Sequence, residues 1–295
     1  MPCCRPLLLT LLIAAWPPTG AAQATDWRGG WGLGRHGPPE MGTAASDGRF
    51  AELELAGTPA QRRAEVRNLL AGPVQVRLRA AGEAASLPTL PFETLLPAGN
   101  RRTLVRLQPD ASGRVQLLLD AVPGDPAARP RDHLYQLPFA DSRIRVDQAF
   151  GGSASHDDAE NGYAVDFALP RGTPVLAARA GTVMQVVDGH PEAGPAPVRG
   201  APANLVRVLH EDGSMAVYGH LQAGIVVRQG HRVEAGQHLG DSGNSGYSTA
   251  PHLHFVVQAN AGLRLQSLPF RMLSPRGELR FARPGAFAPD RGRPL

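Results

Sequence analysis

The chain consists of short runs in which apolar and polar residues alternate, interrupted at close intervals by glycine or proline. It has 34 glycines and 28 prolines among 295 residues, and residues of these types break helices and form the turns between strands. Alternation with a period of two, as at residues 50–55, 74–79 and 104–107, is typical of strands. Hydrophobic residues make up 42% of the chain and charged residues 19%, so it is not disordered throughout. We therefore expect an all-β protein.

The start of the chain has the pattern of an export signal. A positively charged beginning precedes an apolar run at residues 6–16, and small residues follow at 21–24. This order is the signature of a secretory signal peptide, and the apolar run is too short to span a bilayer. We therefore predict cleavage after Ala24, export to the periplasm or beyond the cell, and no stable membrane insertion afterwards. Both cysteines, Cys3 and Cys4, would leave with the signal, so no thiol would remain to bind a metal.

The charge of the chain argues against nucleic acid as a partner. The formal net charge is +4, and all 30 basic residues are arginines. The densest basic stretch is Arg62, Arg63 and Arg67, whose spacing is typical of one solvated face. Nucleic-acid binding needs a concentrated basic patch, so it is not expected. A mild positive charge is compatible with an anionic polymer such as a cell wall.

Composition divides the chain after the signal (1–24) into four segments. Residues 25–48 are rich in glycine and lack periodicity, so we expect a flexible leader. Residues 49–138 hold short alternating runs separated by turns, which predicts an accessory β-sandwich, with an immunoglobulin-like strand arrangement as one option. Residues 139–276 contain eight of the ten histidines and glycine-punctuated strands, which predicts an antiparallel sheet. Residues 277–295 are rich in Pro, Gly and Arg and are expected to be a loosely ordered tail.

The third of these segments contains a weak internal repeat. Residues 172–181 and 230–240 share the order of a glycine, a valine, an alanine and a second glycine. Each is typical of a strand, a glycine turn and another strand, so we expect a sheet built from related hairpins.

The candidate chemistry centres on His252 and His254. On a strand, these two imidazoles would share one face while Leu253 enters the core. Upstream, Asp166 is a lone carboxylate in an apolar run, where burial is costly unless the charge is paired or coordinates a metal.

Two further histidines complete the set of candidates. His156 lies in a Gly/Ser loop shortly before Asp166, and His220 closes a strand-like run at 215–221. Two histidines and one aspartate without sulfur, with one position left open, describe a catalytic rather than a structural zinc site.

Several motifs in this segment resemble those of the lysostaphin/LytM-type zinc metallopeptidases, which cut peptidoglycan cross-links. In the family's order they are AVDFA at 164–168, GTPV at 172–175, YGHL at 218–221, SGNSG at 242–246 and PHLHF at 251–255. The resemblance covers nearly all of residues 139–276 and none of the accessory segment. It implies an antiparallel β-sheet metallopeptidase domain, a Zn2+ cofactor and peptidoglycan peptides as substrate.

The resemblance also implies roles for individual residues. Asp166 and His254 correspond to zinc ligands, while His252 and His220 correspond to the two unligated catalytic histidines. We favour His252 as general base because it neighbours His254 on the strand; His220 would then bind the water or the oxyanion, and the two roles could be exchanged.

The first zinc ligand departs from the family pattern. The family usually has a histidine four residues before the aspartate, where this chain has Gly162. His156 is the only histidine nearby that could replace it, and we predict it as the third ligand. Asp157 and Asp158 are alternative oxygen donors that we expect to face solvent.

Lower-ranking expectations concern the surroundings of the site. Tyr163 and Asn204 are predicted to line the cleft, with the proline-rich loop 188–203 as one wall. We expect surface or structural roles for the remaining histidines, namely His36, His133, His190, His210, His231 and His238. The expected protein is a monomeric endopeptidase. The alternative is a catalytically silent relative that binds the cell wall or activates a cell-wall amidase, although silent members typically lose ligands.

Overall fold

The computed structural model describes residues 50–58, 61–81, 85–108, 116–140, 143–152, 155–193 and 200–281. The predicted signal peptide and leader lie outside these residues, as does the end of the tail. No helix among the described residues is long and apolar enough to cross a membrane. The same residues contain no α-helix and form strands throughout, which confirms the all-β prediction.

Seven strands precede the linker to the histidine-rich segment. They are β1 (Ala51–Ala56), β2 (Arg63–Asn68), β3 (Val74–Ala80), β4 (Ser86–Leu87), β5 (Phe92–Leu96), β6 (Arg101–Leu107) and β7 (Leu117–Pro123). They form two sheets, with strand orders β1-β2-β6-β4 and β5-β3-β7. Val66 of the first sheet and Val76 of the second belong to one buried cluster, so the two sheets share a core. An immunoglobulin-like arrangement of these strands stays a prediction.

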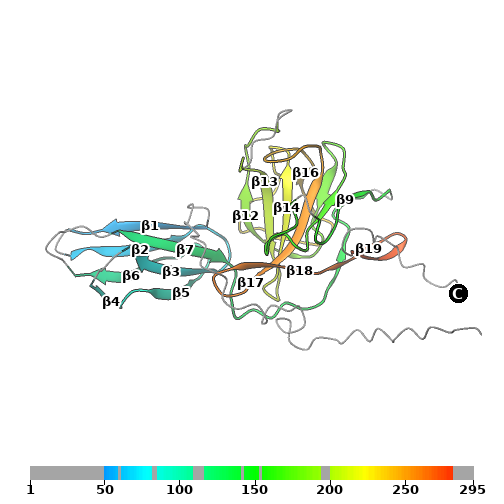
Figure 1. The fold of residues 1–295 in the computed structure, drawn as a ribbon. Coiled ribbons are helices and arrows are strands. Elements are labelled where there is room, and N and C mark those ends of the chain that lie inside the picture. Colours follow the sequence, from blue (N-terminus) through cyan, green and yellow to red (C-terminus); the bar gives the residue numbers. More distant parts are fainter. Residues whose placement is uncertain are drawn as a thin grey trace, which may run out of the picture.

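Thirteen strands follow and build the second part of the molecule (Figure 1). They are β8 (Leu134–Gln136), β9 (Val146–Gln148), β10 (Val165–Phe167), β11 (Pro174–Leu176), β12 (Gly181–Val187), β13 (Asn204–Leu209), β14 (Met215–Leu221), β15 (Arg232–Val233), β16 (His238–Asp241), β17 (Leu253–Asn260), β18 (Leu265–Leu268), β19 (Arg271–Ser274) and β20 (Gly277–Arg280).

The central sheet of this part has the order β15-β12-β13-β14-β17-β10-β9, and β18 pairs with β17. Its pairs are antiparallel, as predicted. Alternate residues such as Val206, Tyr218 and Phe255 point to one face and form the main core. The side chains between them point to the opposite face, which we call the site face because it carries Asp166 and His254.

The two related segments pair with each other. β11 pairs with β16, and β12 pairs with β15, while β11 and β12 belong to different sheets. Each segment is a strand, a turn and a strand, as predicted, but the expectation that each forms its own hairpin was wrong. Strands of similar sequence satisfy their backbone groups across the repeat instead.

The end of the chain is more regular than its composition suggests. Residues 277–280, at the start of the expected tail, form β20, which pairs with β19. Gly277 has a φ of 110°, a conformation that glycine adopts without strain, and Leu279 on β20 is buried in the main core. The turn glycine, the buried leucine and the ion pair between Arg271 and Glu278 at 2.9 Å all contribute to this hairpin.

The sandwich packs against the site face at the end away from Asp166 and His254. Met184 and Met215 belong to the buried cluster of the sandwich, and Leu209 packs against it. The amide of Ala71 donates to the carbonyl of Met184 at 3.0 Å. A Cβ on Gly72 would lie 3.0 Å from side-chain atoms of both Leu209 and Met184, so any larger residue there would require these side chains to shift.

Candidate active site

Strand pairing brings Asp166 and His254 together. Asp166 lies on β10 directly opposite His254 on β17, and its neighbours Val165 and Phe167 are buried in the core. Because residues that are opposite each other in an antiparallel pair project to the same face, both functional side chains reach the site face. The Asp166 Oδ1 lies 2.9 Å from the His254 Nδ1.

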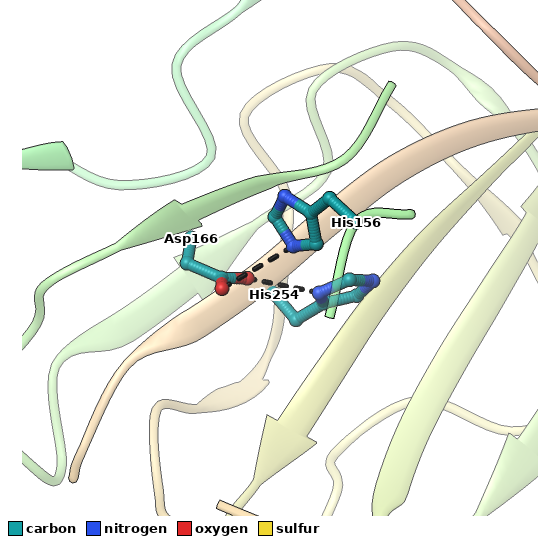
Figure 2. Close-up of side chains that lie close together, drawn as sticks. All are labelled: His156, Asp166 and His254. Carbon is teal, nitrogen blue, oxygen red and sulfur yellow. Dashed lines mark hydrogen bonds and ion pairs between the residues drawn. The ribbon is translucent and has the colours of Figure 1, made fainter. Parts of the chain in front are cut away.

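A loop between β9 and β10 adds His156 to this pair. Its Nδ1 donates to the carbonyl of Ala149 at 3.0 Å, which leaves Nε2 directed at the Asp166 Oδ2, 3.3 Å away. Figure 2 shows the three side chains converging. The potential ligand atoms of His156, Asp166 and His254 lie within 4.8 Å of one another.

This arrangement fits a metal ion. The His156 Nε2 is buried and has no hydrogen-bond partner in the protein, and a polar atom in that state is costly unless a ligand satisfies it. Two imidazole nitrogens and one carboxylate oxygen form the donor set of catalytic zinc sites. His156, Asp166 and His254 could therefore hold the ion.

The other two candidate histidines lie beside this group. The ring centroids of His220 and His252 are 4.5 Å apart, and those of His220 and His254 are 5.9 Å apart. The φ of His220 is 61°. This left-handed conformation is rare for a residue with a Cβ. This local turn at the end of β14 places the His220 ring next to His252. The His252 Nε2 lies 3.8 Å from the Asp166 Oδ1.

Residues 160–264 match the family described as Peptidase family M23. We call the part of the chain that carries this match the M23 domain. The M23 domain is 37% identical over 128 residues to the peptidoglycan DD-endopeptidase ShyA of Vibrio cholerae, covering 42% of this chain and 27% of that protein. It is 41% identical over 102 residues to the glycyl-glycine endopeptidase ALE-1 of Staphylococcus capitis, covering 34% of this chain and 25% of that protein. The chain thus spans about a quarter of the length of these relatives.

Two solved structures are also similar to part of this chain. The catalytic domain of lysostaphin from Staphylococcus simulans is 32% identical and covers 40% of this chain and 83% of its own, with a TM-score of 0.31. The catalytic domain of the M23 protein EnpA from Enterococcus faecalis is 28% identical and covers 45% of this chain and 92% of its own, with a TM-score of 0.34.

Electrostatics of the M23 domain favour an ionised aspartate between His156 and His254. Burial alone would raise the pKa of the Asp166 carboxyl, but the imidazoles of His156 and His254 that face it hold that pKa well below its usual value. Burial opposes protonation of His156, yet the facing Asp166 carboxylate raises the pKa of its imidazole. The carboxylate is therefore available as a ligand across the physiological pH range.

His220 has the opposite tendency. Burial, with the neighbouring His252 and His254, lowers the pKa of His220 to about 3. Its Nδ1 donates to the carbonyl of Ser245 at 2.7 Å. The neutral ring therefore presents an Nε2 lone pair to the site.

Asn204 has a different role from the one expected. Its side chain is fully buried, accepts from the amide of His190 at 2.8 Å, and donates to the carbonyls of His190 and Leu221. These bonds fasten the start of the loop 188–203 to β14. These contacts of the buried amide are all within the protein, and none of them supports the predicted contact with substrate.

Tyr163 also turns towards the protein interior. Its ring packs edge-to-face on Phe150 with the centroids 5.3 Å apart, and its amide donates to the Ser267 hydroxyl at 3.2 Å. The partly buried ring is packed against the main core. These contacts give Tyr163 a packing role, and none of them supports the predicted contact with substrate.

Two polar residues that sequence reasoning missed contact the ligand group. Gln148 donates to the Asp166 Oδ2 at 3.3 Å, and the Asn161 Oδ1 lies 3.2 Å from the His254 Nε2. Neither belongs to a motif with recognisable spacing, so only their place in the fold identifies them. Asp157 and Asp158 are exposed, as predicted.

Proposed function

We propose that this protein is an exported, zinc-dependent endopeptidase that hydrolyses peptide cross-links of peptidoglycan. The observation that carries the proposal is the convergence of His156, Asp166 and His254, whose potential ligand atoms lie within 4.8 Å of one another. One of these atoms, the His156 Nε2, is buried without a hydrogen-bond partner among the described residues. It is supported by the M23 match and by relatives that are named peptidoglycan endopeptidases and metalloproteases. Export rests on the predicted signal peptide.

In this mechanism His156, Asp166 and His254 would hold the metal. Zinc held there would polarise the scissile carbonyl and lower the pKa of a water, which makes that water a better nucleophile. The aspartate contributes a negative charge that lowers the net charge of the site. The backbone bond of His156 fixes the ring so that Nε2 is the nitrogen offered to the metal.

His220 and His252 would share the proton transfers. Both rings donate Nδ1 to backbone carbonyls, those of Ser245 and Ala250, so each neutral ring offers Nε2 as a proton acceptor. The strongly lowered pKa of His220 favours a neutral ring that orients the attacking water. His252 would then take the proton and return it to the leaving amine. This division keeps His252 as the general base.

The test measures metal content and turnover of the purified protein together. We expect about one zinc per chain and release of peptides from cross-linked sacculi. His156→Ala should lose both, while His238→Ala should lose neither, because His238 is exposed and its ring contacts Asp241 at 2.9 Å, outside the group formed by His156, Asp166 and His254. Undiminished zinc in His156→Ala would overturn the ligand assignment. A metal-free wild-type protein that releases no peptides would overturn the proposed peptidase activity.

The bond that is cut can be tested with two substrates. The named relatives include a DD-endopeptidase and a glycyl-glycine endopeptidase, so sacculi with direct D-Ala cross-links and sacculi with glycine bridges should be compared. The alternative function is a silent protein that binds the wall or activates an amidase. It predicts binding to sacculi and a faster partner amidase, without any release by the protein alone.

A further inference from the structure

The four site histidines differ in what holds the ring nitrogen that faces away from the ligand group. Three of them donate this nitrogen to a backbone carbonyl. The pairs are His156 with Ala149 at 3.0 Å, His220 with Ser245 at 2.7 Å and His252 with Ala250 at 2.8 Å. His254 instead places its Nε2 3.2 Å from the side-chain Oδ1 of Asn161. Of these four contacts, therefore, only the one at His254 can be removed by a side-chain substitution.

The orientation of the Asn161 amide is fixed by a second residue. Its Nδ2 lies 3.1 Å from each carboxylate oxygen of Asp158, and its backbone amide donates to the Asp158 Oδ1 at 2.7 Å. An amide nitrogen donates and a carboxylate accepts, so Nδ2 must face Asp158. The carbonyl Oδ1 must then face His254.

The contact sets the proton on the His254 ring. The Nδ1 faces the Asp166 Oδ1 at 2.9 Å and is the nitrogen available to a metal. Because the Asn161 Oδ1 can only accept, it requires a proton on Nε2. A ring protonated on Nε2 leaves the Nδ1 lone pair for the ion, as outer hydrogen bonds do for ligand histidines in general.

The loop that carries Asn161 is built tightly enough to hold this geometry. The Gly162 amide donates to the Asp158 carbonyl at 2.9 Å, and a Cβ at Gly162 would lie 3.0 Å from that oxygen. Gly162 stands where the related peptidases usually have their first histidine ligand. The turn from Asp158 to Gly162 thus lies along the chain between the displaced ligand His156 and Asp166.

We propose that Asn161 is a positioning residue for the metal ligand His254, and that Asp158 holds Asn161 in place. The proposal rests on the proposed function to the extent that the site binds zinc. The segment between His156 and Asp166 then has a role of its own, because it supplies an outer hydrogen bond to the ligand on the opposite strand. Asn161 acts through His254 and has no contact with the reacting atoms.

The test is the zinc affinity of the full chain, measured by competition with a chromophoric chelator. Asn161→Leu keeps the size of the side chain and removes the acceptor. We expect zinc to bind about 10- to 100-fold more weakly, which is the usual cost of losing such a bond. The d–d absorption bands of the Co2+-loaded protein should also shift, because the ring of His254 is free to turn. Asp157→Asn, an exposed position in the same loop, is the matched control and should bind zinc like the wild type.

A second variant separates positioning from simple loss of folding. Exchanging the two partners, as Asp158→Asn combined with Asn161→Asp, keeps the net charge, an acceptor towards His254 and a donor between the two side chains. We expect this double variant to recover zinc affinity to within about threefold of the wild type, since the outer hydrogen bond is restored. Recovery also supports the proposal if Asn161→Leu fails to fold.

The outcomes keep this proposal distinct from the proposed function. Wild-type zinc affinity in a folded Asn161→Leu variant would overturn the positioning role, even if the wild type cleaves sacculi. An exchanged variant as weak as Asn161→Leu would also overturn it. If the wild type binds zinc but cleaves nothing, the affinity loss in Asn161→Leu still supports positioning, and only the peptidase function fails.

Discussion

The two ends of the site face have opposite character. At one end His254 and Asp166 are polar groups held in a network of hydrogen bonds. At the other end Met184 and Met215 are buried against the sandwich. His254 and Asn260 mark the two ends on β17, and six residues of a strand span about 20 Å. One sheet face therefore carries a polar site at one end and apolar packing at the other.

A buried polar pair lies beside the apolar end, since Gln258 is directly opposite Met215. Arg207 on β13 and Gln258 on β17 are both buried, and the guanidinium donates to the amide oxygen at 2.7 Å. The guanidinium also lies 5.9 Å from the ring of Phe50 in the sandwich. The sandwich thus covers polar as well as apolar side chains of this face, and all of them lie away from the group formed by His156, Asp166 and His254. We therefore expect substitutions at one end to change activity and substitutions at the other end to change stability.

The largest effect is expected at the polar end, from His252→Ala. Its side chain is partly exposed and lies outside the buried clusters, so the free energy of unfolding should change little. Loss of a general base lowers kcat by about 10²- to 10⁴-fold, and zinc content should stay at the wild-type level. Rates of peptide release and metal analysis check this. A kcat within about tenfold of the wild type would move the base to His220.

At the apolar end, Met215→Ala should have the reverse effect. Met215 is fully buried, and its Cε lies 3.0 Å from where a Cβ of Gly124 would be. Removing a buried methionine side chain lowers the free energy of unfolding by about 2–5 kcal/mol, to be measured by urea denaturation. Activity per folded molecule should be unchanged. Leu87→Ala, at a position that is 68% exposed, serves as the control, and an equal loss there would show that burial at the interface is not the cause.

A pH effect should also appear at the apolar end, beside Leu209. Burial lowers the pKa of His210 to about 4, and its Nδ1 donates to the Ala180 carbonyl. Between the unfolded value near 6.5 and about 4, the unfolded chain binds the proton and the folded chain does not. Stability should therefore fall as the pH drops through this window, by up to about 3 kcal/mol.

The comparison for this effect is His210→Asn, which can still donate to the Ala180 carbonyl. Denaturant midpoints at several pH values would show the dependence in the wild type and a flatter curve in the variant. Equal slopes would assign the acid sensitivity to other groups.

The smallest effect on activity is expected from fixing the sandwich to the M23 domain. A Cβ on Gly230 would lie 4.0 Å from the Cβ of Ala71, within the range that a disulfide bridges. Gly230 has a φ of 89°, so a cysteine there carries some backbone strain, but the distance allows Ala71→Cys with Gly230→Cys to cross-link in a chain with Cys3→Ser and Cys4→Ser. Activity of the oxidised and reduced forms should agree within about twofold, because the sandwich lies away from the ligand group. Activity that appears only on reduction would mean that the sandwich must leave during turnover.

Much of this comparison follows from the sequence, because alternation and local motifs report on local structure. The runs at 50–55, 74–79 and 104–107 coincide with β1, β3 and β6. Leu253 is buried in the core as the spacing of His252 and His254 requires. For these strands and for Leu253, a few consecutive residues contain the whole signal. His156 is predicted beside Asp166 because the resemblance implies a histidine before the aspartate and His156 is the only one nearby.

Contacts between distant segments were beyond such reasoning. Asn204 holds its loop through a hydrogen bond to Leu221, which lies on another strand. The residue that faces the His254 Nε2 is Asn161, in a turn that has no recognisable motif. The left-handed conformation of His220 is a local feature, but histidine is not a residue type that predicts it. The packing of Met184 and Met215 against the sandwich could not be predicted either, because no pattern in the two segments indicates that they are in contact.

The strand β8 has a consequence for the order of folding. It lies in the linker and pairs in parallel with β19, near the end of the chain. Closing so long a loop is slow, since its entropy must be lost before the contact forms. During synthesis the sheet β20-β19-β8 therefore cannot be completed until residues 271–273 are made. The last strands of the chain then act as the closing step, and a nascent chain lacking them would leave part of the main core exposed, since Met272 and Leu279 belong to it.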